Sequence, residues 1–430
     1  MARRHARQIC PSPDDRLASS AWWGRSGREW INRSVSGATP GYIPQLVSAS
    51  DAGRHASRAS RRRCCTFRSS RPALIREALR RWQQPEHRGH PIDLPGPAPI
   101  DSLPYELPVL TGVDDVAAWL ALTPAEVDWF ADRGSWLTTA RPALRHYRVS
   151  HREKRTGTRI IEAPKPMLRE TQRRILRRLV QRIPAHPAAR GFVPGGSTAA
   201  FAWAHSDRPV VLRADLRHCF ESITVSRVRH VFAQAGYPAG VARVLAELCT
   251  TTTPPDQLID VDPAHAGLLR RRHLPQGAPT SPHLANLALL RLDQRLDGYA
   301  RRNQLRYTRY GDDLAVSGDA MDADRALWTL LRIVEDCGFV VHPEKVRIMP
   351  AHQRQRLAGL VVNDRPQVSR EDYDRLRALL HNAARHGPES QNHSAHPDFR
   401  AHVYGLIAWV GATSETRRRR LLDMADHVHW

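Results

Sequence analysis

The sequence predicts an α+β fold in which short strands form an antiparallel sheet and amphipathic helices lie between them. Two β-favouring runs flank Gly311-Asp312-Asp313, the pattern of a hairpin with adjacent carboxylates at its turn. The apolar run of residues 209–216 carries Asp215 near its end, which indicates a buried strand with a third carboxylate. Because Gly and Asp also form ordinary turns, the hairpin alone fits either a plain turn or a site for a divalent cation.

Composition points to a nucleic-acid partner. The 430 residues are enough for two or three domains, and the net charge of +22 favours a polyanionic ligand. Of the 65 basic residues only Lys154, Lys165 and Lys345 are lysines. The six cysteines lack paired spacing, which argues against a disulfide framework or a zinc site and favours a cytoplasmic location. No apolar run approaches the roughly 18 residues of a membrane span, so no membrane contact is expected.

The N-terminal part of the chain is expected to contain an extension and a helical segment. Residues 1–98 hold 18 Arg against 7 Asp plus Glu, with weak apolar periodicity, and are predicted to be a disordered basic extension. Residues 99–144 are predicted to form short helices, one of them starting at Thr123 as N-cap with Pro124 at the first helical position.

From residue 145 onward the elements alternate between strands and helices. A strand pair is predicted around a turn at 154–157, and an amphipathic helix over 167–182 with five outward arginines suits a surface that follows a nucleic-acid backbone. The remaining expected elements are helices at 226 onward, 283–299 and 320–337, a loop at 338–348, a single strand at 357–363, and helices at 370–386, 402–410 and 415–427.

The order of these segments resembles a reverse transcriptase, most closely the bacterial retron type, over about residues 145–410. Six segments carry the resemblance: Thr158 to Pro166, Arg213 to Ile223, Leu274 to Leu287 (the LPQGxPTSPxLxN motif), Tyr310 to Asp313 (the YxDD box), Gly338 to Ile348, and Gly359 to Asn363. The resemblance implies a right-hand polymerase with fingers and palm over 145–362 and a small helical thumb over 363–430.

Two-metal phosphoryl transfer explains the spacing of the acidic residues independently. Carboxylates that converge from different strands can hold two Mg²⁺ ions, which stabilise the attacking and leaving oxygens. Asp215, Asp312 and Asp313 supply that set. Lys345 matches the family's lysine that protonates pyrophosphate, a role that an arginine cannot fill.

Five further residues match positions that handle the incoming dNTP. Arg159, with Lys154 as the weaker candidate, matches the basic residues that hold the triphosphate. A ring at Phe220 would clash with a ribose 2′-hydroxyl and so favour deoxynucleotides, although a plainly buried phenylalanine is the alternative. Gln276 matches the residue at the sugar and base pair, and Gly277 would permit close approach of the backbone.

The expected function is RNA-directed DNA synthesis on a structured non-coding RNA in a bacterial retron antiphage system. The partners are the RNA template and primer, dNTPs, the RNA–DNA product duplex and an effector protein. Departures from the retron pattern occur at Phe201, at Leu357 and Ala358, at Gly311 and at His342. They leave open a non-retron defence-associated or group II intron-like reverse transcriptase, and a nucleic-acid-binding scaffold without synthesis is the alternative from another class.

Overall fold

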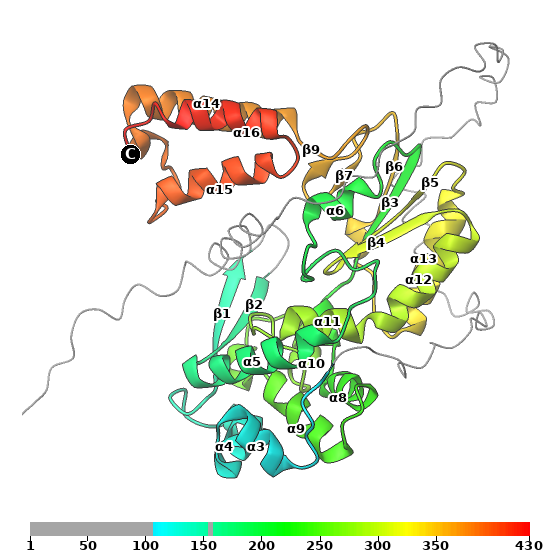
Figure 1. Ribbon diagram of the computed structural model, residues 1–430, viewed down its shortest axis with the longest axis vertical. Helices are drawn as coiled ribbons and strands as arrows, with labels where there is room; N and C mark the ends of the chain where they lie inside the picture. Colours follow the sequence, from blue (N-terminus) through cyan, green and yellow to red (C-terminus); the bar gives the residue numbers. More distant parts are fainter. Residues whose placement is uncertain (1–105, 154–157) are drawn as a thin grey trace, which may run out of the picture. The chain divides into compact units, whose positions relative to one another are not determined.

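The computed structural model describes residues 106–153 and 158–430 (Figure 1). The predicted extension of residues 1–98 and the candidate Lys154 lie outside these described residues. The chain divides into two compact units, one with the described residues up to Ala378 together with Val410–Arg417, the other with Leu379–Trp409 and Arg418–Trp430. Among the described helices, none combines the length and apolar character needed to cross a bilayer.

A four-stranded antiparallel sheet forms the centre of the first unit. Its strands are β3 (Val210–Asp215), β4 (Arg306–Tyr310), β5 (Asp313–Gly318) and β6 (Arg347–Pro350), in the order β4-β5-β3-β6. β3 therefore lies between β5 and β6, and its residues are almost all buried, as expected for an apolar strand. The predicted α+β class with antiparallel pairing is confirmed.

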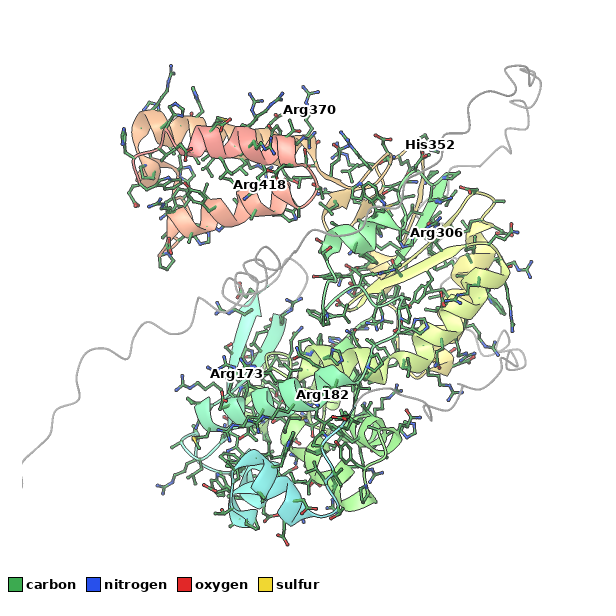
Figure 2. All side chains as sticks on the ribbon, viewed as in Figure 1. Arg173, Arg182, Arg306, His352, Arg370 and Arg418 are labelled. Atoms are coloured by element: carbon green, nitrogen blue, oxygen red, sulfur yellow. The ribbon has the colours of Figure 1, made fainter. Side chains whose placement is uncertain are left out.

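The predicted strand pair and basic helix are present, but the helix is shorter than expected. β1 (Tyr147–Glu153) pairs with β2 (Thr158–Pro164) in antiparallel register, and α5 (Pro166–Arg178) follows. Leu179 leaves helical geometry at φ −130°, and a 3₁₀ turn over Val180–Arg182 continues the chain. Figure 2 labels Arg173 and Arg182 among the many arginine side chains of this region.

Helices pack around the sheet and the strand pair. The described segment before β1 contains α3 (Val113–Leu120) and α4 (Pro124–Ala131), and the Thr123 hydroxyl caps α4 by accepting the backbone N–H of Glu126 at 3.2 Å. The later helices of this unit are α6 (Thr198–Trp203), α7 (Cys219–Ser222), α8 (Val225–Gln234), α9 (Ala239–Cys249), α10 (Pro263–Leu269), α11 (Ser281–Ala288), α12 (Leu290–Arg302) and α13 (Ala323–Asp336).

Two continuous elements predicted from the sequence are interrupted. The expected helix over 283–299 breaks at Leu289, where ψ is 2°, so α11 and α12 are separate. The expected single strand over 357–363 is a tight hairpin of β7 (Arg356–Leu357) and β8 (Leu360–Val361), extended by β9 (Gln367–Val368). Ala358 and Gly359 have φ values of 45° and 85°, the two positive values of a hairpin turn.

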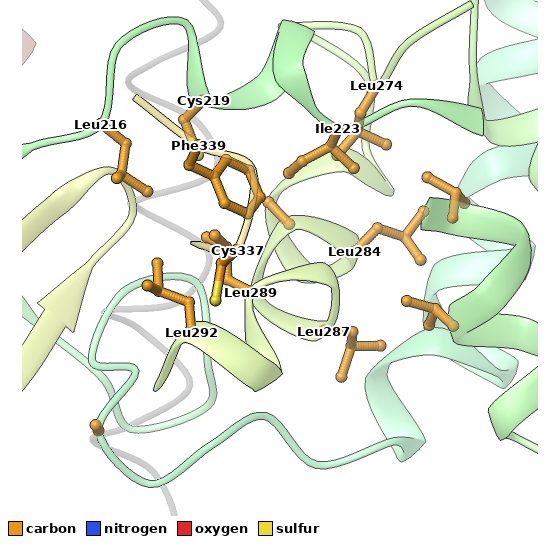
Figure 3. Close-up of a cluster of buried hydrophobic side chains, with 14 of the residues drawn as sticks. Leu216, Cys219, Ile223, Leu274, Leu284, Leu287, Leu289, Leu292, Cys337 and Phe339 are labelled. Atoms are coloured by element: carbon orange, nitrogen blue, oxygen red, sulfur yellow. The ribbon is translucent and has the colours of Figure 1, made fainter. Parts of the chain in front are cut away.

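The hydrophobic core joins the sheet to the helices that follow it. Figure 3 shows Leu216 and Cys219, just beyond β3, beside Phe339 and leucines of α11 and α12. This packing anchors the chain immediately after Asp215 to the interior, so the strand end has little freedom to move.

Three helices complete the C-terminal part of the chain. They are α14 (Arg370–His386), α15 (Phe399–Gly411) and α16 (Glu415–Ala425), at the positions predicted from helical periodicity and with ends that differ by a few residues. Their existence is confirmed for each of the three predicted segments.

Candidate active site

Backbone pairing brings the three predicted carboxylates to one end of the central sheet. Asp215, the last residue of β3, is the register partner of Asp313, the first residue of β5. The N–H of Leu216 donates to the carbonyl of Asp312 at 2.9 Å, and Tyr310 pairs with Asp313 to close the β4–β5 hairpin. A strand end and a hairpin turn thus meet as the sequence predicted.

The negative charges of this cluster are only partly compensated, because two cationic side chains face three carboxylates. Burial raises the pKa of Asp312 to about 6, and the neighbouring carboxylates of Asp215 and Asp313 add to the shift. Burial also raises the pKa of Asp313, although its ion pair with Arg213 opposes the change. Such crowding of buried carboxylates favours the binding of a cation.

Two cationic side chains contact the carboxylates directly. Lys345 Nζ donates to Asp215 Oδ1 at 2.7 Å, and Arg213 donates to Asp313 Oδ1 from Nη2 at 2.6 Å and from Nε at 3.0 Å. The 3₁₀ turn that carries Lys345 is itself tied to β3, because the N–H of His342 donates to the backbone carbonyl of Asp215 at 2.7 Å.

The ion pair of Arg213 was not anticipated from the sequence. Arg213 precedes Asp215 by two positions on β3, and the sheet places it opposite Ala315 and Arg347 on the neighbouring strands. Side chains alternate between the two faces of a strand, so residues two positions apart lie on the same face. The spacing of Arg213 and Asp215 could therefore have indicated that this arginine lies close to the carboxylates.

A buried ion pair and its hydrogen bonds support the β4–β5 hairpin. Arg309, inside β4, donates to Asp293 Oδ2 at 2.6 Å and Oδ1 at 2.8 Å, and neither side chain has any exposed surface. Tyr307 donates its hydroxyl to Asp293 Oδ1 at 2.7 Å. Arg309 Nη1 also donates to Asn286 Oδ1 and to the carbonyl of Gly311, both at 2.9 Å. The network therefore reaches the turn residue that precedes the two aspartates.

The conformation of the turn requires glycine at position 311. Its φ of 64° lies in the left-handed region, and an added Cβ would stand 3.2 Å from the ring of Phe192. At Gly191 an added Cβ would stand 2.9 Å from the backbone nitrogen of Gly311. The segment before Gly191 runs along β4, where the N–H of Arg309 donates to the carbonyl of Ala188 at 2.8 Å.

His205, just beyond α6, links the end of this helix to the central sheet. Its Nδ1 lies 2.7 Å from the hydroxyl oxygen of Ser317, and its Nε2 lies 2.7 Å from that of Thr308. Complete burial lowers the pKa of His205 to about 3, so the ring is neutral and one nitrogen donates while the other accepts.

Two of the candidate dNTP residues come from segments far apart in the chain, α7 and β2. Phe220 lies in α7 and is partly buried against the core. Arg159 is a half-buried residue of β2, where it pairs with Arg152.

The loop that carries Gln276 and Gly277 is attached to β2. The carbonyl of Gln276 accepts the N–H of Glu162 at 2.9 Å. Gly277 has φ 135°, and an added Cβ would stand 3.1 Å from the carbonyl oxygen of Glu162. The glycine therefore permits a close approach between two backbones. The Glu162 side chain is buried in turn, bonded to His273 Nε2 at 2.8 Å and to the hydroxyl of Thr253 at 2.7 Å.

Comparisons with known proteins agree with this arrangement. The family model described as reverse transcriptase (RNA-dependent DNA polymerase) matches residues 151–362. The retron Mx65 reverse transcriptase of Myxococcus xanthus is 40% identical over 326 residues, which cover 74% of this chain and 72% of the relative. The retron Mx162 reverse transcriptase of the same organism is 33% identical over 73% of this chain and 66% of the relative. The retron Ec86 reverse transcriptase of Escherichia coli is 29% identical over 66% of this chain and 81% of the relative. The chain belongs to the retron-type reverse transcriptases and is an RNA-directed DNA polymerase.

Proposed function

We propose that this enzyme copies a structured non-coding RNA into DNA by nucleotidyl transfer at Asp215, Asp312 and Asp313, with Mg²⁺ as the metal. The observation that carries the proposal is the pairing of Asp215 with Asp313 beside the backbone bond from Leu216 to Asp312. Three acidic residues from two separate segments converge there, and the raised pKa of Asp312 reflects burial first and the repulsion of the neighbouring carboxylates second.

The chemistry of the donors fits a hard divalent cation. Carboxylate oxygens are the ligands that Mg²⁺ takes up, and two such ions would stabilise charge on the attacking and leaving oxygens of the phosphoryl group. Arg213 contacts Asp313 and Lys345 contacts Asp215, so these two cations hold the carboxylates in position.

Other residues are assigned to the nucleotide. Lys345 is half-exposed and within reach of Asp215, which suits a group that donates a proton to departing pyrophosphate. Phe220 lies in α7, a short distance along the chain from Asp215. We assign its ring to the exclusion of nucleotides that carry a ribose 2′-hydroxyl. Arg159 is assigned to the triphosphate and Gln276 to the sugar and base pair, because β2 and the 276–277 loop are joined.

The wider assignment follows the relatives, whose names identify them as retron enzymes. We assign the fingers and palm to residues 145–362 and the thumb to residues 363–430. The RNA template and its primer, dNTPs and the RNA–DNA duplex are the proposed partners, and an effector protein in antiphage defence is the proposed biological partner. The arginine-rich α5 offers contacts to phosphate.

Primer extension by the purified full-length protein tests the catalytic assignment. With an RNA template, a primer, Mg²⁺ and dNTPs, Asp312→Asn and Asp313→Asn should each lose at least about a hundredfold in rate, because metal sites supply several kcal/mol of charge stabilisation. Asp364→Asn, at an exposed position, is the control and should match the parent. Equal extension by all four proteins would refute the assignment.

Sequencing of the nucleic acid that copurifies with the enzyme tests the choice of template. A covalently branched RNA–DNA made from one non-coding RNA is the expected result. DNA without a linked RNA, in a preparation that extends primers normally, would contradict the retron assignment while leaving the polymerase assignment intact.

A further inference from the structure

A second group of potential metal ligands lies just beyond the candidate active site. It consists of His218, Glu221 and His265, whose ligand atoms all lie within 4.8 Å of one another. His218 is the N-cap residue of α7, Glu221 lies inside α7, and His265 comes from α10, far away in the chain. Within residues 106–153 and 158–430, this is the one group of three His, Cys, Asp or Glu side chains whose ligand atoms lie that close together.

The group is a built site and not a loose surface cluster. His265 and Glu221 are only 5% and 6% exposed. The Nε2 atom of His265 is buried and has no hydrogen-bond partner. Its distance to Glu221 Oε1 is 3.5 Å, which is too long for a good hydrogen bond. Buried polar atoms are nearly always satisfied, so an orphaned imidazole nitrogen that faces a carboxylate points to an additional ligand.

The distance between the ligand atoms of His265 and Glu221 agrees with a tetrahedral ion. Metal–ligand bonds of about 2.0–2.1 Å at tetrahedral angles separate neighbouring ligand atoms by about 3.3 Å. The separation of 3.5 Å between His265 and Glu221 is close to that value. His218 is stacked on His265 with ring centroids 3.8 Å apart, and because it is half-exposed it can rotate from this stack to present a nitrogen.

We propose that His218, Glu221 and His265 form a binding site for one zinc ion, with a water molecule as the fourth ligand. Two imidazoles and one carboxylate are a donor set that zinc uses, whereas Mg²⁺ takes oxygen ligands in octahedral geometry. The site is distinct from the Asp215, Asp312 and Asp313 cluster, which offers oxygen donors alone.

Zinc at this position would join two elements that are far apart in the chain. α7 carries Phe220, and α10 precedes the loop of Gln276 along the chain. Binding would fix α7 against α10 and hold the backbone on either side of Phe220. The absence of paired cysteines spoke against zinc in the sequence, but this site needs none, because its ligands meet only in the folded chain.

Direct measurement of bound zinc in the full-length protein tests the proposal. The protein is dialysed against Zn²⁺ with excess Mg²⁺, which occupies the oxygen site, and its metal content is measured by elemental analysis. The parent should retain about one zinc more than His218→Gln and Glu221→Gln. His218 is half-exposed, so its replacement is expected to leave the fold intact, and circular dichroism checks that it does.

Two further measurements keep the outcome clear. His396→Gln, in the His-rich part of the C-terminal segment, is the control for adventitious binding and should retain the zinc of the parent. Co²⁺ in place of Zn²⁺ should give the visible absorption of a tetrahedral site in the parent and lose it in His218→Gln. Equal zinc in the parent, His218→Gln and Glu221→Gln would overturn the proposal, as would a parent that retains none or a loss confined to His396→Gln.

Discussion

Replacement of Asp293 by asparagine should destabilise the enzyme strongly, because it leaves a buried guanidinium without its counter-charge. Asp293 and Arg309 have no exposed side-chain surface, so water cannot compensate the lost charge. Two charge-assisted hydrogen bonds of 2.6 and 2.8 Å join them. Asparagine keeps one acceptor oxygen, so one bond of about 1.5–3 kcal/mol is lost and the other loses its charge assistance, which costs about 1 kcal/mol more. Breaking a buried pair by removing one partner typically costs about 3–5 kcal/mol, in agreement with that figure.

Urea unfolding, followed by circular dichroism, is the assay. The midpoint of the Asp293→Asn variant should fall while the slope m stays unchanged, since the surface exposed on unfolding is the same. The matched control is Glu371→Gln. It breaks an ion pair with Arg354 of similar geometry, at 2.8 Å, whose side chains are 60% and 51% exposed. That variant should unfold at nearly the same urea concentration as the parent, because solvent screens an exposed ion pair.

A double replacement separates stability from positioning. Asp293→Leu combined with Arg309→Met removes both charges, but it also leaves the buried Tyr307 hydroxyl and Asn286 Oδ1 without these partners, so it should recover only part of the stability lost in Asp293→Asn. It also removes the donor that holds the Gly311 carbonyl at 2.9 Å, so DNA synthesis should stay slow and the Mg²⁺ concentration for half-maximal rate should rise. A loss below about 1 kcal/mol in Asp293→Asn would refute the reasoning on stability. Parental Mg²⁺ dependence in the folded double variant would refute the reasoning on positioning.

Three further predictions concern the nucleotide and metal sites. Phe220→Ala should improve use of ribonucleotides by about tenfold or more, measured as the ratio of kcat/KM for dNTP and rNTP, and an unchanged ratio would remove the assigned role. Gly277→Ala should lower stability by about 1–2 kcal/mol because of its φ of 135° and the nearby β2 carbonyl, whereas Gly298→Ala, in open space on α12, should stabilise by up to about 1 kcal/mol. The raised pKa of Asp312, about 6 against 3.8, means that the folded state favours the protonated acid, so metal-free stability falls as the pH rises from about 4 through 6. In EDTA at pH 8, the free energy of unfolding of Asp312→Asn should therefore exceed that of the parent by at most about 3 kcal/mol. This difference should disappear below pH 4, and the control Asp364→Asn should show no such dependence on pH.

The parts of the fold that depend on local patterns could be predicted from the sequence. Residues 209–216 form an apolar run, and the runs on either side of Gly311 are rich in β-favouring residues, so β3, β4 and β5 were expected where they occur. The N-cap of α4 also depends on local sequence. Thr123 accepts the backbone N–H of Glu126, as its position before Pro124 predicted.

The partners of buried charges could not be predicted in this way. Asp293 and Arg309 lie on a helix and a strand, and helical or strand periodicity assigns charged residues to solvent by default. Likewise the break at Leu289 has no Gly or Pro to mark it, and the turn at Ala358 uses a non-glycine residue at φ 45°. Tertiary packing decided these features, and local sequence carries little information about it.

Gly311 and Phe192 constrain each other in a way that extends to sequence variation among relatives. An alanine at position 311 would meet the ring of Phe192 at 3.2 Å and would also carry the cost of left-handed geometry, about 1–2 kcal/mol. An enzyme with alanine at this position therefore requires a different turn conformation and a smaller or displaced side chain at position 192. We expect the two positions to co-vary, so a library with both positions randomised should yield active pairs that neither single library contains.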